Sequence, residues 1–430
     1  MPYFFLKKYL VIIYLINVSL YCFADFASDT VYLTWKRCPD TTMTIQWITR
    51  LEDPQSQVYY EVPGSLNRQQ KIGSSALLPN SKEYLLHQVE LTNLTPNTLY
   101  QFAISADPLI KPLFFQTMPQ ELQEPIRFVI GGDMYHDGKT TKDMQKTCHQ
   151  AVKTNPHFAI LGGDIAYAVS GSGLHSEENI DRWIDWIRAW SSCMRTENGR
   201  LIPVLSAIGN HDLRGQYNQT PAQAKVFSSL FPMPGERIYN AIDFGQYMSF
   251  FIMDSGHANS IDGEQSKWLK EVLQARTKTL HRFAIYHVPA YPSIRNFNNP
   301  QSVAIRKYWV PIFEQNGIQM AFEHHDHAYK RTIPLLQGKL NAKGIVYIGD
   351  GAWGVDRARP KSKVKKPYLA KFISSRHFIL MTIDPLKREM KSIDDSGKVI
   401  DEYITYFPSP EKCPIIKKES EGEQILVPMK

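Results

Sequence analysis

Residues 158–167 read Phe-Ala-Ile-Leu-Gly-Gly-Asp-Ile-Ala-Tyr, a short apolar run that ends in two glycines, a carboxylate and a phenol. The run predicts a buried strand, and the glycines predict a tight turn at its carboxyl end, because glycine lets the backbone approach a ligand closely. Asp164 and Tyr167 would then lie just beyond the strand. In α/β sheets, this edge is where functional sites are built.

The same pattern occurs four more times along the chain. Each time, an apolar run ends in residues with oxygen or imidazole side chains. These runs, with the residues that end them, are 127–133, 204–212, 283–287 and 318–327. Apolar residues at helical spacing in 180–190 and 268–273 predict amphipathic helices between the strands. The alternation of strands and helices predicts an α/β domain.

Seven donor side chains follow these predicted strands. They are Asp133, Asp164, Tyr167, Asn210, His287, His325 and His327. Oxygen and imidazole donors together suit zinc, manganese or iron, and seven donors exceed what one ion needs. Two ions about 3.5–4 Å apart that share one carboxylate would use all of them. One such histidine alone would more often be a core residue, but the five-part series favours a metal centre.

The series resembles the five blocks of the binuclear metallophosphoesterases, and specifically the purple acid phosphatases. The matching motifs are Gly-Asp-x-x-Tyr at 163–167, Gly-Asn-His-Asp at 209–212, a histidine at 287, and His-x-His-Ala-Tyr-x-Arg at 325–331. Tyr167 discriminates, because in purple acid phosphatases this tyrosine binds ferric iron and gives the colour by charge transfer.

The resemblance implies an Fe(III) site and a divalent site for zinc, manganese or Fe(II), bridged by Asp164. The Fe(III) ligands would be Asp133, Asp164, Tyr167 and His327. The divalent ligands would be Asp164, Asn210, His287 and His325. The implied activity is hydrolysis of small-molecule phosphomonoesters by a hydroxide that the two ions generate from water.

Three further residues are candidates for contact with the substrate or the leaving group. His211 is next to Asn210 and would hydrogen-bond the phosphate or protonate the leaving alkoxide. Asp212 would orient that imidazole. Arg295 is a candidate phosphate contact, and Asn210 would contribute to substrate binding as well.

The chain departs from the family pattern at four positions. Tyr135 takes the third position of the first block, where glycine or histidine is usual, and Ala284 replaces a valine in the fourth block. His324 replaces a glycine in the fifth block, and Asp326 lies between its two histidines. The family's substrate-pocket histidines have no clear match after His287. No expected metal ligand is missing, so the departures concern pocket shape and substrate preference.

The N-terminal third has a different periodicity. Short alternating segments separated by turn residues over 30–117 predict a β-sandwich. Residues 94–100 resemble the tyrosine corner of fibronectin type III domains, and such a domain precedes the catalytic domain in purple acid phosphatases. We expect a fibronectin type III-like sandwich at 25–118, a metallophosphoesterase domain of mixed sheets flanked by helices at 119–410, and a tail at 411–430.

The first 24 residues indicate a secretory signal peptide, because Lys7 and Lys8 precede an apolar run that is short for a membrane span and ends near Ala24. We therefore expect a secreted or periplasmic protein with no stable membrane anchor. The mature chain would keep four cysteines, enough for two disulfides with three possible pairings. These cysteines are Cys38, Cys148, Cys193 and Cys413.

The composition sets outer limits. With 43% hydrophobic and 21% charged residues, the 430-residue chain is globular, which excludes a disordered, collagenous or polytopic membrane protein. The net charge of +7 is compatible with an anionic substrate, and the basic residues are too dispersed to predict a nucleic-acid partner. Two alternatives stay open: a phosphodiesterase or nucleotide pyrophosphohydrolase using the same site, and a secreted binding protein whose phosphatase domain is inert.

Overall fold

The computed structural model describes residues 27–406 apart from eight short stretches. Those stretches are 52–54, 107–110, 137–140, 170–176, 234–236, 350, 357 and 361. The expected signal peptide, the expected tail and Cys413 lie outside the described residues, and these expectations stay predictions. Every helix in the described part is too short or too polar to cross a membrane.

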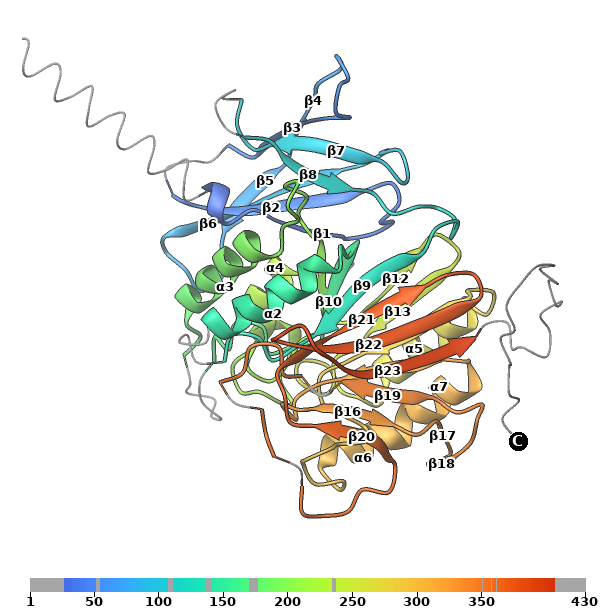
Figure 1. Ribbon diagram of the computed structural model, residues 1–430. Helices are drawn as coiled ribbons and strands as arrows, with labels where there is room; N and C mark the ends of the chain where they lie inside the picture. The colour runs from blue at the N-terminus through green and yellow to red at the C-terminus, as the bar shows by residue number, and fades with distance from the viewer. Residues whose placement is uncertain are drawn as a thin grey trace, which may run out of the picture.

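The N-terminal region is a sandwich of two four-stranded antiparallel sheets (Figure 1). One sheet has the order β1 (Tyr32–Thr34), β2 (Met43–Arg50), β6 (Tyr84–Leu91) and β5 (Ser74–Leu77). The other has the order β4 (Gln69–Ile72), β3 (Gln57–Glu61), β7 (Leu99–Ala103) and β8 (Leu113–Gln116). The expected tyrosine corner is confirmed, because the Tyr100 hydroxyl accepts a 2.9 Å hydrogen bond from the Thr95 N–H.

The second region contains two mixed sheets packed face to face, as the sequence predicts (Figure 1). The six-stranded sheet has the order β11 (Val204–Ser206), β10 (Phe158–Leu161), β9 (Ile126–Gly131), β21 (His377–Ile383), β22 (Lys387–Asp394) and β23 (Val399–Tyr406). The seven-stranded sheet has the order β12 (Asn240–Phe244), β13 (Met248–Ile252), β14 (His281–Ile285), β15 (Met320–Glu323), β19 (Val346–Gly349), β16 (Tyr329–Thr332) and β20 (Leu369–Ile373). A separate hairpin consists of β17 (Leu335–Leu336) and β18 (Lys339–Leu340).

Helices cover the outer side of each of these two sheets (Figure 1). Those beside the six-stranded sheet are α2 (Thr141–Lys153), α3 (Ile180–Cys193), and α4 (Lys225–Leu230) with the short 3-10 helix η1 (Pro221–Ala224) before it. Those beside the seven-stranded sheet are α5 (Glu264–Gln274), α6 (Pro300–Tyr308) and α7 (Val310–Gln315). The predicted helices over 180–190 and 268–273 are thus confirmed as α3 and α5.

Aromatic rings fill the space between the two sheets. Phe128 stacks on Phe158 with ring centres 4.9 Å apart, and Phe250 meets Phe128 edge-on at 5.3 Å. Full burial of such a side chain stabilises the fold by about 1.5–3 kcal/mol. Because helices cover the outer faces and the other sheet covers the inner ones, the central strands are buried on both sides. This explains their continuous apolar sequences.

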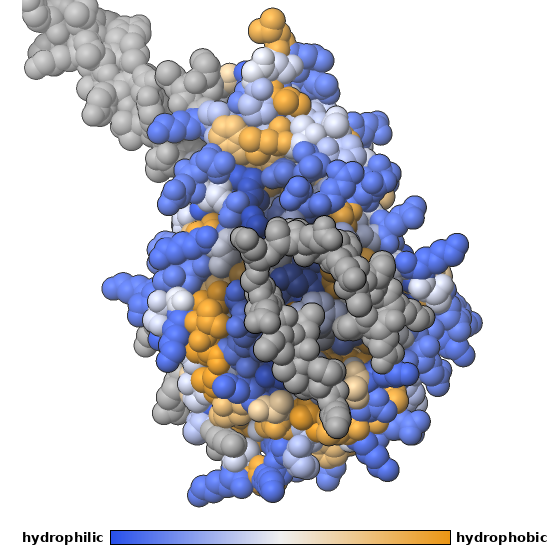
Figure 2. All heavy atoms as spheres, turned by 45° about the vertical axis from the view of Figure 1, so that its right-hand side comes forward, coloured by the Kyte–Doolittle hydropathy of each residue, from blue (hydrophilic) through white to orange (hydrophobic). Residues whose placement is uncertain are grey.

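The sandwich contacts the second region beside α3 and α4. The Tyr32 hydroxyl donates to the carbonyl of Leu230 at 2.9 Å, and the Asn80 amide donates to Glu178 at 2.9 Å. These contacts join the two regions through polar atoms at defined positions. On the face seen in Figure 2, hydrophilic side chains dominate and hydrophobic ones are confined to patches.

Four cysteines would be enough for two disulfides, and the structure describes three of the four. Cys38, Cys148 and Cys193 are free thiols in the described part of the chain, so no pair among these three is bonded. Cys38 is exposed, whereas Cys148 on α2 and Cys193 at the end of α3 are buried together in the core between the helices and the sheet.

Candidate metal centre

The sequence-predicted donors follow the carboxyl ends of parallel strands. β9, β10 and β11 are parallel neighbours in one sheet, and β14 and β15 are parallel neighbours in the other. All five predicted strands are therefore confirmed, and the loops after them bring the donor side chains into contact. The donors are nearly inaccessible to solvent, with exposed fractions between 0 and 6%.

Five of the seven donors have a left-handed backbone conformation. The φ angles are 54° at Asp133, 54° at Asp164, 48° at Tyr167, 79° at His325 and 57° at His327. A residue with a Cβ rarely adopts such a conformation, which costs about 1–3 kcal/mol and persists only where the surrounding structure enforces it. The fold therefore holds these loops against their local preference, which is common at functional sites.

One group of donors contains a carboxylate, a phenol and an imidazole. Asp133 Oδ1 lies 3.0 Å from the Tyr167 hydroxyl and 2.9 Å from His327 Nε2. The hydroxyl and His327 Nε2 are 3.1 Å apart. Burial, followed by the nearby carboxylates Asp133 and Asp164, raises the pKa of the Tyr167 phenol well above its ordinary value. Only a strongly charged cation would hold this side chain as a tyrosinate.

A second group of donors surrounds His287 Nε2. Asn210 Oδ1 lies 3.0 Å from this nitrogen, His325 Nδ1 lies 3.1 Å from it, and Asp164 Oδ2 lies 3.2 Å from it. The atoms of Asp164, His287 and His325 are close enough together to share one metal ion. Asp164 Oδ2 is buried and accepts no hydrogen bond from any residue that the structure describes, whereas its other oxygen accepts from the His211 N–H at 2.7 Å.

The tautomer of His287 shows why this group needs a cation. His287 Nδ1 lies 2.9 Å from the carbonyl oxygen of Gly162, which can only accept, so Nδ1 carries the proton. In the neutral ring, Nε2 then points a lone pair at the oxygens of Asp164 and Asn210. Burial lowers the pKa of His287, but Asp164 and Asp133 outweigh it and raise the pKa to about 9. A proton or a metal ion must therefore lie among these atoms.

The spacing of the donors fits transition-metal coordination. Bonds of about 2.1 Å from one ion to two ligands at right angles put the ligands about 3.0 Å apart. The donor pairs in both groups are separated by 2.9–3.2 Å. Together with the donor-free oxygen of Asp164, this spacing shows that the residues present fit metal ions.

His211 lies beside the donors, held by its own backbone and ring. Its Nδ1 lies 2.7 Å from the Val169 carbonyl oxygen, and its ring stacks on Tyr167 with centres 4.5 Å apart. Because the carbonyl fixes the proton on Nδ1, Nε2 is the nitrogen left for another partner. The ring is thus fixed next to the first donor group and is only partly buried.

Asp212 corrects one prediction. Its carboxylate does not orient the His211 imidazole. It is completely buried and accepts hydrogen bonds of 2.8 Å from the N–H groups of Asp164, Ile165 and Gly209. Asp212 therefore ties together the two loops that carry Asp164 and Asn210, and its contribution is to the position of the donors.

Comparisons with known proteins agree with this geometry. The family model described as "Purple acid Phosphatase, N-terminal domain" matches residues 28–117, and the model described as "Calcineurin-like phosphoesterase" matches residues 123–329. The chain belongs to the purple acid phosphatase family. It is a metallophosphoesterase, and so a phosphoester hydrolase of a metal-dependent family.

The relatives are distant in sequence. "Probable purple acid phosphatase 20" of Arabidopsis thaliana is 26% identical over 333 residues, which cover 72% of this chain and 71% of that protein. "Purple acid phosphatase 13" of the same plant is 24% identical, with 64% of this chain and 55% of that protein covered. The structure of purple acid phosphatase PPD1 from yellow lupin seeds aligns with a TM-score of 0.68 at 16% identity, covering 91% of this chain and 77% of that chain. This last likeness shows the shared fold.

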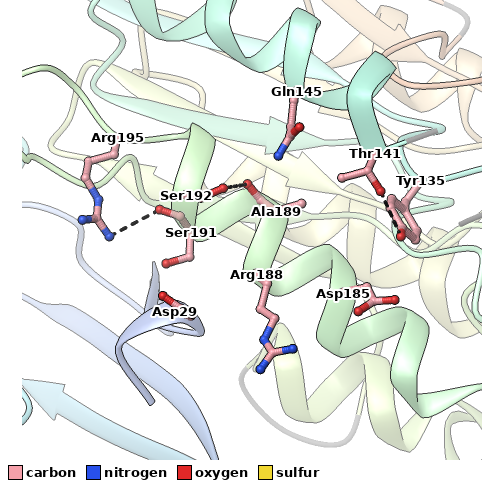
Figure 3. Close-up of a pocket in the computed structure, with 10 residues that line it drawn as sticks. All are labelled: Asp29, Tyr135, Thr141, Gln145, Asp185, Arg188, Ala189, Ser191, Ser192 and Arg195. Carbon is pink, nitrogen blue, oxygen red and sulfur yellow. Dashed lines mark hydrogen bonds between the residues drawn. The ribbon is translucent and has the colours of Figure 1, made fainter. Parts of the chain in front are cut away.

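Tyr135, a departure from the family pattern, points away from the donors. Its hydroxyl accepts a 3.1 Å hydrogen bond from the Thr141 hydroxyl at the start of α2. The ring lies at one end of a cavity of about 610 Å³ between α2, α3 and the segment around Asp29 (Figure 3). None of the seven donors lines this cavity, so Tyr135 changes the helical layer beside the site and not the donor set.

His324, another departure, fills space that glycines create. A Cβ added to Gly162 would lie 1.8 Å from His324 Nδ1, and one added to Gly132 would lie 2.7 Å from its Cδ2. Nδ1 also lies 3.0 Å from the carbonyl oxygen of Tyr286. Burial lowers the pKa of His324 to about 4, so the ring is neutral. In this member of the family, the imidazole packs beneath the loops that carry the donors.

Arg295 lies at the edge of the site and is held by Asp326. Its Nη2 donates to the His325 carbonyl at 3.2 Å, and its Nε lies 3.4 Å from the Asp326 carboxylate. Asp326 also accepts from the N–H of Ile294 at 2.7 Å. The Arg295 side chain remains 32% exposed, so the structure places a guanidinium beside a predicted metal ligand.

Sequence reasoning missed Tyr217. Its hydroxyl lies 3.5 Å from His325 Nε2, and its ring lies 4.9 Å from that of His257. Tyr217 therefore closes the side of the second donor group. No motif includes this residue, and its position became visible only in the fold.

Proposed function

We propose that this protein hydrolyses phosphomonoesters of small molecules at a binuclear metal centre. The observation that carries the proposal is the pair of buried donor groups around Asp164, one of whose oxygens accepts no hydrogen bond from the residues that the structure describes. The Fe(III) ligands would be Asp133, Asp164, Tyr167 and His327. The ligands of a zinc, manganese or Fe(II) ion would be Asp164, Asn210, His287 and His325.

The charges of the donors support this assignment of the two ions. Two carboxylates and a tyrosinate would supply three negative charges to the first ion, which favours a trivalent metal. The second group offers two neutral imidazoles, an amide and the shared carboxylate, which suits a divalent ion. Ions held by these residues would supply Lewis-acid chemistry, which lowers the pKa of water and offsets charge on the phosphate oxygens.

The protein's own residues would bind and orient the ester. Arg295 is only partly buried, and a guanidinium matches the geometry of phosphate oxygens. His211 Nδ1 donates to the Val169 carbonyl, so Nε2 is the nitrogen that would hydrogen-bond the phosphate or pass a proton to the departing alkoxide. The buried carboxylate of Asp212 would hold the loops that carry Asp164 and Asn210 in fixed positions relative to each other.

The experiment is hydrolysis of p-nitrophenyl phosphate by the purified protein, with metal analysis of the same samples. We expect Asp164→Asn to lower kcat/KM by at least about a thousandfold and to reduce occupancy at both metal positions, because the bridging charge is removed. The matched control is Asp262→Asn, which changes an exposed carboxylate. Full activity with both ions retained in Asp164→Asn would contradict the proposal.

The same assay separates the alternatives. Faster hydrolysis of bis-p-nitrophenyl phosphate than of p-nitrophenyl phosphate would favour the phosphodiesterase. A protein that takes up no iron and hydrolyses neither compound would favour the binding protein with an inert domain.

We also propose that the protein is secreted or periplasmic. The support is the sequence alone, in which two lysines precede a short apolar run near the N-terminus. Sequencing of the purified protein's N-terminus should find that the chain begins shortly after Ala24, and a retained Met1 would contradict this.

A further inference from the structure

A strongly basic segment lies near the donors. Between residues 357 and 371 the sequence has seven lysines and arginines and no acidic residue. The basic residues are therefore not evenly dispersed along the chain, because they are concentrated in this segment. Like charges so close together repel one another, and an anionic ligand would relieve this repulsion.

Three contacts join described residues of this segment to the edge of the candidate metal centre. The Arg359 N–H donates to the carbonyl of the metal-ligand candidate His327 at 2.8 Å. The Lys366 ammonium donates to the carbonyl of Arg295 at 2.7 Å. The Tyr368 hydroxyl donates to the carbonyl of Pro292 at 2.6 Å. The basic segment is thus tied to the fifth block and to the loop that carries Arg295.

The segment also forms a cavity of about 450 Å³. Among the described residues, its polar lining consists of four lysines and two serines and includes no acidic residue. These residues are Ser293, Ser362, Lys363, Lys365, Lys366 and Lys371. Within the part of the chain that the structure describes, Lys363, Lys365 and Lys371 form no ion pair. The cavity therefore offers uncompensated positive charge.

Asp326 connects this cavity to the metal centre. It lies between His325 and His327 and holds the loop 293–295, with the Ser293 hydroxyl 3.3 Å from one carboxylate oxygen. Ser293 faces the lysine cavity, whereas Arg295 reaches the carbonyl of His325. One short loop thus has the cavity at one end and the metal-ligand candidates at the other.

We propose that the lysine cavity is a second anion subsite, and that the preferred substrates are phosphomonoesters carrying a second phosphate group. This inference rests on the proposed function, because it assigns the reacting phosphate to the metal centre and the second phosphate to the lysines. Lysine ammonium groups bind phosphate as point charges without a fixed geometry, so the subsite would accept differently shaped molecules that share this charge.

The test compares two sugars that differ by one phosphate, fructose 1,6-bisphosphate and fructose 6-phosphate. We expect kcat/KM for the bisphosphate to exceed that for the monophosphate by about tenfold or more in the unaltered protein, and the excess to shrink at high salt. The double variant Lys363→Gln/Lys365→Gln should lose most of this excess while hydrolysing p-nitrophenyl phosphate normally. The control, Lys278→Gln/Lys343→Gln, removes two exposed lysines elsewhere and should keep it.

Two results would overturn the subsite: equal kcat/KM for the two sugars in the unaltered protein, or equal losses in the two double variants. If the protein hydrolyses no phosphomonoester, the proposed function fails instead. Calorimetric titration of the metal-loaded protein with fructose 1,6-bisphosphate then decides the matter. Weaker binding only in Lys363→Gln/Lys365→Gln supports the subsite, and equal binding by the two double variants rejects it.

Discussion

Two buried carboxylates, Asp212 and Asp326, lie beside metal-ligand candidates. Each accepts hydrogen bonds that hold a loop in place, but in a different part of the site. Asp212 accepts hydrogen bonds from three backbone N–H groups in the loops that carry Asp164 and Asn210. Asp326 accepts hydrogen bonds from the loop that carries Arg295, and Ser293 of that loop lines the lysine cavity. One carboxylate thus positions the metal donors, and the other positions the residues that would meet the substrate.

The comparison separates chemistry from substrate preference. The donors are buried, and five of the seven have left-handed backbones that the fold enforces, so these positions should tolerate little change. The residues at the edge of the site, here called the rim, are Arg295 and the lysines of the cavity. They are partly exposed and are held by contacts such as the one from the Lys366 ammonium to the Arg295 carbonyl. We therefore expect substitutions near the donors to affect metal content, and substitutions at the rim to affect the choice of substrate.

Among the substitutions that test this comparison of the two carboxylates, Asp212→Asn should have the largest effect. The amide keeps the volume of the side chain but turns an NH₂ group toward backbone N–H groups, which leaves buried donors without acceptors. We expect metal content to fall and kcat/KM for p-nitrophenyl phosphate to drop by about a hundredfold or more. Metal analysis and the assay on Asp212→Asn and the control Asp262→Asn check this. Full metal content and activity would show that Asp212 does not position the donors.

Gly162→Ala should have the next largest effect, on stability. The added Cβ would overlap the His324 ring, and overpacking of this kind costs about 1–3 kcal/mol. Thermal unfolding should show a lower Tm for Gly162→Ala and a partial recovery in Gly162→Ala/His324→Gly. If the second substitution gives no recovery, the contact with His324 is not the cause.

Asp326→Asn should have the smallest effect and should separate the two carboxylates. The amide weakens the hold on the Arg295 loop but leaves the donor groups in place. We expect normal metal content and a rise in KM for p-nitrophenyl phosphate of about tenfold, with a smaller change in kcat. Loss of metal from this variant would remove the distinction between Asp212 and Asp326.

The sequence predicts which side chains come together because each of them follows a mainly apolar strand. Strands buried on both faces have this pattern, and glycines before Asp133, Asp164 and Asn210 mark their ends. The role of Asp212 could not be predicted in this way. Its hydrogen-bond partners Asp164 and Ile165 lie more than forty residues away in the chain, and only the pairing of β10 with β11 brings them together.

The contacts at the rim could not be predicted from the sequence either. Arg295 is a plausible phosphate contact from its residue type, but its neighbours Asp326 and Lys366 come from other loops. The packing of His324 depends on distant residues as well, because its ring fills the space beside glycines that precede it by more than 150 residues. Residue types at strand ends are local information, whereas these contacts depend on the arrangement of both sheets.

The most direct test of the central claim is the visible absorption spectrum of the purified protein and of Tyr167→Phe, with iron measured in both. If Tyr167 binds Fe(III) as a tyrosinate, the unaltered protein has a purple or pink charge-transfer band with iron present, and Tyr167→Phe lacks the band. An unchanged band in Tyr167→Phe, or an iron-loaded protein without any band, would contradict the account.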